Sequence, residues 1–389
     1  MNRQSLASVQ HKPLLQTIKW LMVLGAISYF ITGIYCYLTG PPGDLIRRWR
    51  EAGYWLQGYD PIQVARTKTP YLIEYGRMLP GDGYPPWAYV YALLTASPVL
   101  PFPVVKTLFL IFNLSAIVTL GYFIRSEYKF PKTSEQWPML FAAALCSSAV
   151  AIALRWHQYG ILVTVLIWAF LYFEEKGWPL CAGLSLAFAF IKPQTSALFF
   201  LLPLMRRSFK TCLWCGLFLV LATGIAAWRC HTSPWTMLVE TFHTGVANWF
   251  YLGIGDPLKN IIGAQPLLLI SIGIVTFIVL ILLNRWKLAP TYYLAAVPAV
   301  FSTFWMSHRN HDLMIVSLLI VPLFSLALKQ QRLNIVIAMA LFAYCFPHFA
   351  IFYGEPYFWP VPILFRVMWL FGLIYLLESV NYSQVKRKI

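Results

Sequence analysis

A series of apolar runs separated by short polar hinges constrains the fold of this chain more than any other feature. The runs occupy residues 17–38, 103–124, 138–154, 159–173, 179–191, 193–205, 211–228, 266–284, 290–306, 313–328, 333–352 and 361–380. Most exceed the roughly 9–11 residues of a membrane-spanning strand, and lipid requires each span to satisfy its own backbone. We therefore predict an all-α, polytopic transmembrane protein with about 12 membrane segments, forming a single integral membrane domain over residues 1–389.

The composition agrees with a membrane environment. Apolar residues make up 59% of the chain and charged residues only 11%, against about 25% charged in an ordinary soluble domain. The net charge of +16 indicates basic cytoplasmic loops facing anionic lipid rather than nucleic acid. More than half of the 30 basic residues fall on one side of this arrangement, which predicts cytoplasmic termini, including a tail at residues 381–389. The first run lacks a cleavage site and is expected to be a retained helix.

Two long segments lie on the predicted outer side, at residues 40–101 and 229–265. The first is rich in aromatic residues, and Trp87 to Ala96 is expected to form an interfacial helix. Between the short runs 179–191 and 193–205 stands Lys192-Pro193, which predicts a broken helix beside a polar cavity.

The seven cysteines are scattered through apolar sequence. The pair Cys212 and Cys215 lies within the run 211–228, so a buried and inert thiol pair is expected rather than a redox or zinc site.

Polar residues near the outer ends of the runs are the candidates for a functional site. Asp44 follows the first run by a few residues. An Asp at this position is able to cap a loop helix, and its carboxylate is also able to act as a catalytic base. Arg155, Trp156, His157 and Gln158 interrupt two runs at an outer turn. A snorkelling Arg beside an interfacial Trp accounts for only two of these four residues.

Two further polar groups are less easily explained by topology alone. Lys192, with Gln194 nearby, lies near membrane depth, where a Lys costs about 2.5 kcal/mol or more unless it is paired or solvated. Residues 307–312 form a polar knot between two runs, with His308 and His311 three positions apart. A solvated turn or a functional knot both fit this segment, whereas no zinc-binding spacing supports a metal site.

These motifs follow one another in an order that resembles the GT-C superfamily of membrane glycosyltransferases, and most closely glycosyltransferase family 87. The resemblance is carried by Asp44 after the first helix, Gly58-Tyr59-Asp60-Pro61, Tyr84-Pro85-Pro86, His157-Gln158 opening a helix, Ile191-Lys192-Pro193-Gln194, and the late His308 to His311 knot. Two of them depart from the usual pattern: His157-Gln158 replaces Gly-Gln, and the late knot lacks adjacent histidines.

The resemblance implies an inverting enzyme that transfers a hexose, mannose in this family, from a polyprenyl-phosphate donor to a lipid or glycan acceptor. It places the catalytic carboxylate in the first external loop, at Asp44. The donor phosphate is then expected to contact Lys192, Arg155, His157, Gln158, His308, Arg309 and His311. Substrate contacts are expected from Asp60, Tyr84 and Gln194.

No metal and no cofactor are expected for such a donor. The expected partners are the polyprenyl-phosphate sugar, the glycolipid or glycan acceptor and membrane lipids, and the expected state is a monomer. The compact tail favours a bacterial inner membrane, with the active site on its outer face. A lipid or solute transporter (flippase) is one alternative function, and a non-catalytic envelope assembly protein is another.

Overall fold

The computed structural model describes residues 3–67, 69, 71–76, 84–127, 136–249, 264–305, 310–331, 333–346 and 360–385. Within these ranges the regular structure is entirely helical, as predicted. In chain order the helices are α1 (Arg3–Thr39), α2 (Gly43–Leu56), α3 (Pro61–Thr67), α4 (Pro86–Thr95), α5 (Phe102–Glu127), α6 (Gln136–Leu145), α7 (Ser148–Arg155), α8 (Gly160–Glu175), α9 (Pro179–Ala189), α10 (Pro193–Ser196), the 3₁₀ helix η1 (Ala197–Phe200), α11 (Leu201–Met205), α12 (Phe209–Arg229), α13 (Pro234–Trp249), α15 (Ala264–Arg285), α16 (Thr291–Leu294), α17 (Ala296–Trp305), the 3₁₀ helix η2 (Asn310–Val316), α18 (Ser317–Gln330), α19 (Ile335–Cys345) and α21 (Pro360–Val385).

The expectation of about twelve membrane segments is not confirmed. By length and hydropathy, five helices in the described residues could cross a membrane: Leu14–Thr39, Phe102–Glu127, Phe209–Arg229, Asp312–Gln330 and Ile363–Val380. The pair α6 and α7 becomes a sixth if the two helices, bent by 56° at their junction, form one span. The other apolar runs fold into shorter helices, because a hydropathy pattern does not register where a helix breaks inside an apolar stretch.

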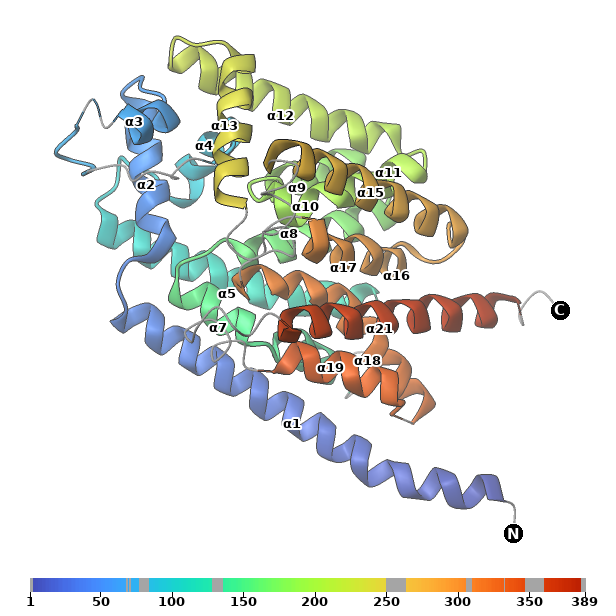
Figure 1. The fold of residues 1–389 in the computed structure, drawn as a ribbon. Helices are drawn as coiled ribbons and strands as arrows, with labels where there is room; N and C mark the ends of the chain where they lie inside the picture. The colour runs from blue at the N-terminus through green and yellow to red at the C-terminus, as the bar shows by residue number, and fades with distance from the viewer. Residues whose placement is uncertain are drawn as a thin grey trace.

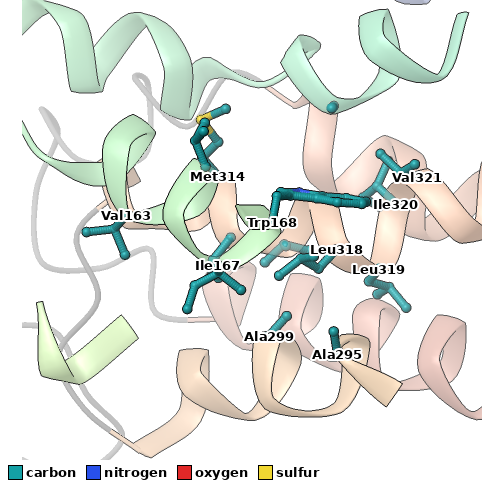
Figure 2. Packing of buried hydrophobic residues seen from close by; sticks show 14 of the residues in the cluster. Val163, Ile167, Trp168, Ala295, Ala299, Met314, Leu318, Leu319, Ile320 and Val321 are labelled. Atoms are coloured by element: carbon teal, nitrogen blue, oxygen red, sulfur yellow. The ribbon is translucent and has the colours of Figure 1, made fainter. Parts of the chain in front are cut away.

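Helix α8 lies in the centre of the bundle and is buried along most of its length. Figure 2 shows its Val163, Ile167 and Trp168 among side chains of η2, α17 and α18, including Met314 and Leu318. All five side chains are buried, and between helices in lipid such close van der Waals packing is a main source of stability. This packing fixes the start of α8, and with it the turn that joins α7 to α8.

The junction between α6 and α7 lies within an apolar stretch, so its free backbone groups need partners. The Ser147 hydroxyl accepts a hydrogen bond from the backbone N–H of Ala149 (3.2 Å), and Tyr344 donates to the carbonyl of Ala144 (2.6 Å). The carbonyl of Cys345, at the end of α19, accepts from Tyr29 (2.6 Å). The end of α6 and the start of α7 thus each have a hydroxyl partner. A helix break in lipid requires such partners for its free backbone groups.

The first long segment folds into helices that cover one end of the bundle, next to α12 and α13 (Figure 1). Tryptophan indoles attach it to the bundle. Trp55 donates to the carbonyl of Ala226 (3.2 Å), and Trp87 donates to that of Phe190 (2.9 Å). Helix α4 confirms the helix expected around residues 87–96. The start of α1 and the end of α21 both lie away from α2 and α3 (Figure 1).

Candidate functional site

Helix α2 places Asp44 directly against the turn between α7 and α8. The backbone N–H of Asp44 donates to the carbonyl of Trp156 (2.8 Å). Asp44 stands in the first turn of α2, where a carboxylate is favoured by the helix dipole, although Pro42 and not Asp44 is the N-cap residue. A Cβ atom built on the neighbouring Gly43 would lie 2.1 Å from the Trp156 carbonyl oxygen. The glycine therefore permits this contact between two backbones.

Gly43→Ala is expected to separate α2 from the α7–α8 turn. Its methyl group meets backbone atoms, which cannot rotate away, so we expect a loss of about 1–3 kcal/mol in stability, as for overpacked sites. Gly216→Ala in α12 is the matched control, because no atom lies within 4 Å of its added Cβ. Thermal unfolding in detergent measures both variants. A Gly43→Ala protein with an unchanged melting temperature would contradict the close contact.

The α7–α8 turn supplies an amide that bridges Asp44 to a buried lysine. Gln158 Nε2 donates to Asp44 Oδ2, and Gln158 Oε1 accepts from Lys192 Nζ at 2.9 Å. The amide orientation follows from these two partners, since only the oxygen accepts a hydrogen bond from an ammonium. His157, the preceding residue, has a positive φ of 53°, which helps to turn the chain between the two helices.

Lys192 lies in the break between α9 and α10, as predicted, and it has a carboxylate partner. Its Nζ atom lies 2.7 Å from Asp312 Oδ1 of η2, and the side chains of this ion pair are only 2% and 3% exposed. Asp44, Gln158, Lys192 and Asp312 thus form a continuous set of hydrogen bonds, which we call the polar chain. It joins four segments of the protein that are far apart in sequence.

Tyr84 lies close to both ends of the polar chain. Burial raises its pKa, the Arg48 guanidinium opposes this increase, and the negative charges of Asp44 and Asp312 add to it. The guanidinium of Arg48 covers the Tyr84 ring at 3.6 Å from the centroid and also pairs with Glu51. Tyr84 is therefore placed in the site by a cation of the same helix that carries Asp44.

Arg48, Glu51 and Asp312 were missed by reasoning from sequence. The signal for the first two was present, because positions 44, 48 and 51 share one face of a helix. For Asp312 the sequence signal was weaker. The residue ends the polar segment 307–312, whose histidines were the residues singled out as candidates. Its partner Lys192 is 120 residues away in sequence.

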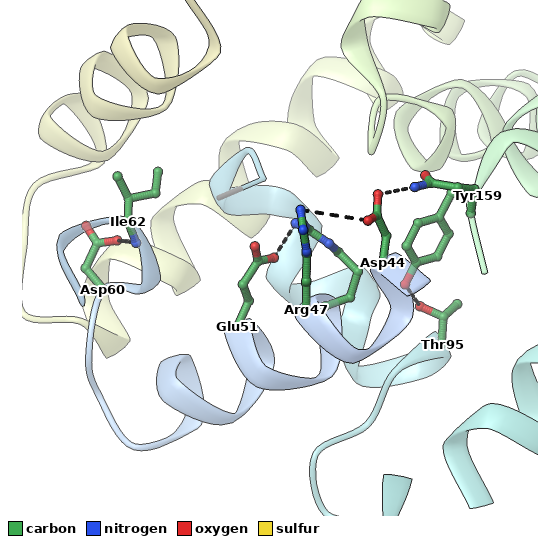
Figure 3. A network of polar contacts seen from close by, with 9 residues as sticks. Asp44, Arg47, Glu51, Asp60, Ile62, Thr95 and Tyr159 are labelled. Carbon is green, nitrogen blue, oxygen red and sulfur yellow. Dashed lines mark hydrogen bonds and ion pairs between the residues drawn. The ribbon is translucent and has the colours of Figure 1, made fainter. Parts of the chain in front are cut away.

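Arg47 is the exposed cation of this site. Its guanidinium lies 3.9 Å from Asp44 Oδ1, and the two side chains are 38% and 22% exposed. Figure 3 shows Asp44 facing Arg47 on one side. The hydrogen bond from Gln158 reaches the other carboxylate oxygen, Oδ2. The Oδ1 side of the carboxylate is thus the side nearer to the solvent-exposed guanidinium.

His157 is enclosed and rests against the Tyr37 ring, with ring centroids 4.1 Å apart. Burial lowers its pKa to about 4; the positive charge of Lys106 acts in the same direction, and the Asp44 carboxylate opposes it. Neither ring nitrogen makes a hydrogen bond of ordinary geometry with a described residue. A neutral imidazole is therefore expected at physiological pH.

Asp60 lies apart from the polar chain, at the start of α3 (Figure 3). Its Oδ1 atom accepts a hydrogen bond from the backbone N–H of Ile62 (2.9 Å). Burial raises the pKa of this carboxyl, and the Ile62 N–H partly offsets the increase. This geometry gives Asp60 a structural role at a helix start.

The other predicted site residues are placed as follows. Arg155 ends α7 with its guanidinium 5.3 Å from the centroid of the Trp156 ring, and Gln194 stands in the first turn of α10. His308 and Arg309 lie outside the described residues, as does the side chain of His311.

Comparison with known sequences decides the family. The sequence model of glycosyltransferase family 87 matches residues 83–328, which is well over half of the chain. The chain belongs to glycosyltransferase family 87. It is therefore a glycosyltransferase, and its long apolar helices fit an integral membrane protein. No curated protein matches the sequence.

The family match includes most of the polar chain but not all of it. Gln158, Lys192, Asp312 and Tyr84 lie within residues 83–328, whereas Asp44 precedes them. The carboxylate that the geometry brings to this family 87 site thus comes from outside the matched region.

Proposed function

We propose that this family 87 protein is an inverting hexosyltransferase that uses a polyprenyl-phosphate sugar, with mannose as the expected sugar, and a lipid or glycan acceptor. The observation that carries the proposal is the setting of Asp44. Its carboxylate is partly exposed beside Arg47, and a buried amide holds its other oxygen. Such a carboxylate suits a general base, which must reach substrate while staying ionised and oriented.

In the proposed reaction, the acceptor hydroxyl oxygen attacks the anomeric carbon while Asp44 takes the hydroxyl proton. The bond from that carbon to the phosphate oxygen breaks, and the electron pair leaves with the polyprenyl phosphate. A single displacement of this kind inverts the anomeric configuration. Because Oδ2 is engaged by Gln158, Oδ1 is the oxygen that we assign to proton transfer.

The leaving phosphate requires cations or hydrogen-bond donors where charge develops. Arg47 meets this need from the exposed side of Asp44, and Arg155, His157, His308, Arg309 and His311 remain proposed contacts. Lys192 and Gln158 are better suited to supporting the base, since Asp312 already compensates the ammonium charge. Tyr84 and Gln194 are proposed on the substrate side, whereas Asp60, which lies apart from the polar chain, is proposed to act at a helix start.

We further propose that transfer occurs at the outer face of a bacterial inner membrane, with both termini in the cytoplasm. A reporter that is active only outside the cytoplasm should work when fused after Asp60 or Thr232, and fail after Lys132 or Arg285. The expectation follows from the excess of basic residues on one side. Activity after Lys132 would reverse the orientation and move the site to the cytoplasmic face.

The activity is tested by incubating the purified protein with labelled polyprenyl-phosphate sugars and a crude lipid acceptor pool. Transfer of the label to a new lipid or glycan is the expected result. Movement of intact labelled donor across vesicles without any new product would instead identify a flippase.

A further inference from the structure

Asp312 has no part in the transfer step proposed above, yet it is buried and ion-paired at the inner end of the polar chain. A buried carboxylate and ammonium are expensive to desolvate, and apolar residues of similar size often replace such a pair without loss of stability. Packing alone therefore gives no reason for a charged pair at this position. A role in orienting neighbouring groups gives one.

We propose that Asp312 is a positioning residue, which acts through Lys192 and Gln158 to hold the Asp44 carboxylate in its base-competent orientation. The proposal rests on the proposed function, because it takes Asp44 to be the base. In this proposal the polar chain connects η2, which carries Asp312, with α2, which carries Asp44.

The first step of the argument concerns the ammonium of Lys192. Two of its three N–H groups have partners in the polar chain, Asp312 Oδ1 at 2.7 Å and Gln158 Oε1 at 2.9 Å. Without a counterion, this buried ammonium would leave an uncompensated charge in the protein interior, which is strongly destabilising. Asp312 thus holds the Nζ atom in position.

The second step concerns the amide of Gln158. A charged donor fixed at Oε1 prevents the amide from rotating, because a flipped amide would turn its NH₂ group toward the ammonium. The NH₂ group is thereby directed toward Asp44 Oδ2. A hydrogen bond donated to a carboxylate favours its ionised form, so the same contact orients Asp44 and keeps it unprotonated.

Several other charged or titratable groups face Asp44. Arg47 comes from its own helix and His157 from the α7–α8 turn, while Arg48 of the same helix lies over the Tyr84 ring. Tyr84 is electrostatically coupled to both Asp44 and Asp312. Among the described residues, none of these groups donates a hydrogen bond to Gln158 Oε1 as Lys192 does. A change at Asp312 is therefore expected to act through the polar chain.

The experiment compares Asp312→Asn, Asp312→Glu and the apolar double variant Lys192→Met/Asp312→Leu in the full-length protein. Asp312→Asn should lower kcat by about 10- to 100-fold, as for weakened base catalysis, with little change in the KM for donor. The acidic limb of its pH–rate profile should move to higher pH, since Asp44 then loses a hydrogen bond to its charged form. Asp312→Glu should recover part of the rate.

The double variant separates positioning from stability. Removal of both charges should restore the melting temperature that Asp312→Asn loses, while kcat stays low. The matched control is Glu174→Gln at the other end of α8, where the carboxylate accepts a hydrogen bond from Thr211 at 2.7 Å. It should leave the pH–rate profile unchanged.

Two outcomes would overturn the positioning role: a wild-type kcat and pH profile in Asp312→Asn, or a double variant that regains both stability and rate. If Asp312→Asn does not fold, the rate of the double variant decides. Failure of the proposed function looks different, because Asp44→Asn would then turn over normally. An inactive Asp44→Asn beside a fully active Asp312→Asn would reject only the role of Asp312.

Discussion

Asp44→Asn is expected to reduce glycosyl transfer by about 10² to 10⁴-fold, the usual cost of losing a general base. Asn keeps the size of the side chain, and the backbone N–H that donates to Trp156 is untouched. An Asn oxygen is also able to accept the hydrogen bond from Gln158. The substitution therefore removes the capacity to take a proton and little else. Steady-state transfer assays with a labelled polyprenyl-phosphate sugar measure the loss.

Binding of the donor should survive Asp44→Asn, since the carboxylate faces the acceptor and repels the phosphate. Asp60→Asn is the matched control, because Asp60 caps a helix start away from the polar chain. It should be much milder. Turnover at the wild-type rate in Asp44→Asn would remove the assignment of the base, and equal losses in both variants would leave the choice of base between Asp44 and Asp60 open.

Lys192→Ala is expected to cost about 3–5 kcal/mol of stability, the range found when one partner of a buried ion pair is removed. The Lys192 side chain is among the largest fully buried ones, and its removal leaves a cavity as well as the uncompensated charge of Asp312. Transfer should fall as well, because Gln158 loses the donor that orients it. Thermal unfolding and transfer assays on the same preparation measure the two effects.

Two comparisons test the origin of this loss. Lys287→Ala removes an exposed cation and should change stability by no more than about 0.5 kcal/mol, as surface substitutions do. Lys192→Ala combined with Asp312→Ala should lose less than the sum of the single variants, since the double variant leaves neither charge of this pair without its partner. Strict additivity would show that the two residues do not interact energetically.

Much of the helical framework followed from the sequence. Apolar runs predicted an all-α protein, and Lys192-Pro193 predicted the break between α9 and α10. The number of membrane segments did not follow, because several runs fold into shorter helices inside one apolar stretch. Hydropathy reports where a chain is apolar, whereas the break between α6 and α7 depends on hydroxyl partners such as Tyr344.

The sequence also singled out Asp44, Gln158 and Lys192, but as separate features. Their connection into the polar chain depends on tertiary contacts, which join residues 114 positions apart for Asp44 and Gln158 and 34 positions apart for Gln158 and Lys192. Asp312 could not be assigned to Lys192 from spacing, since no local pattern relates them. The buried carboxylate partner of Lys192 was therefore not foreseen.

The contact between the Asp44 backbone and Trp156 bears on the recognition of pseudoenzymes in this family. The region that defines the family match begins at residue 83, so a paralogue is able to keep the whole matched region and still lack the carboxylate. Such a protein would retain the amide and the buried ion pair but, on the role proposed here for Asp44, would lack the group that takes the proton of the acceptor. The residue that donates its N–H to the α7–α8 turn is therefore the position to inspect before any relative of this chain is assumed to be active.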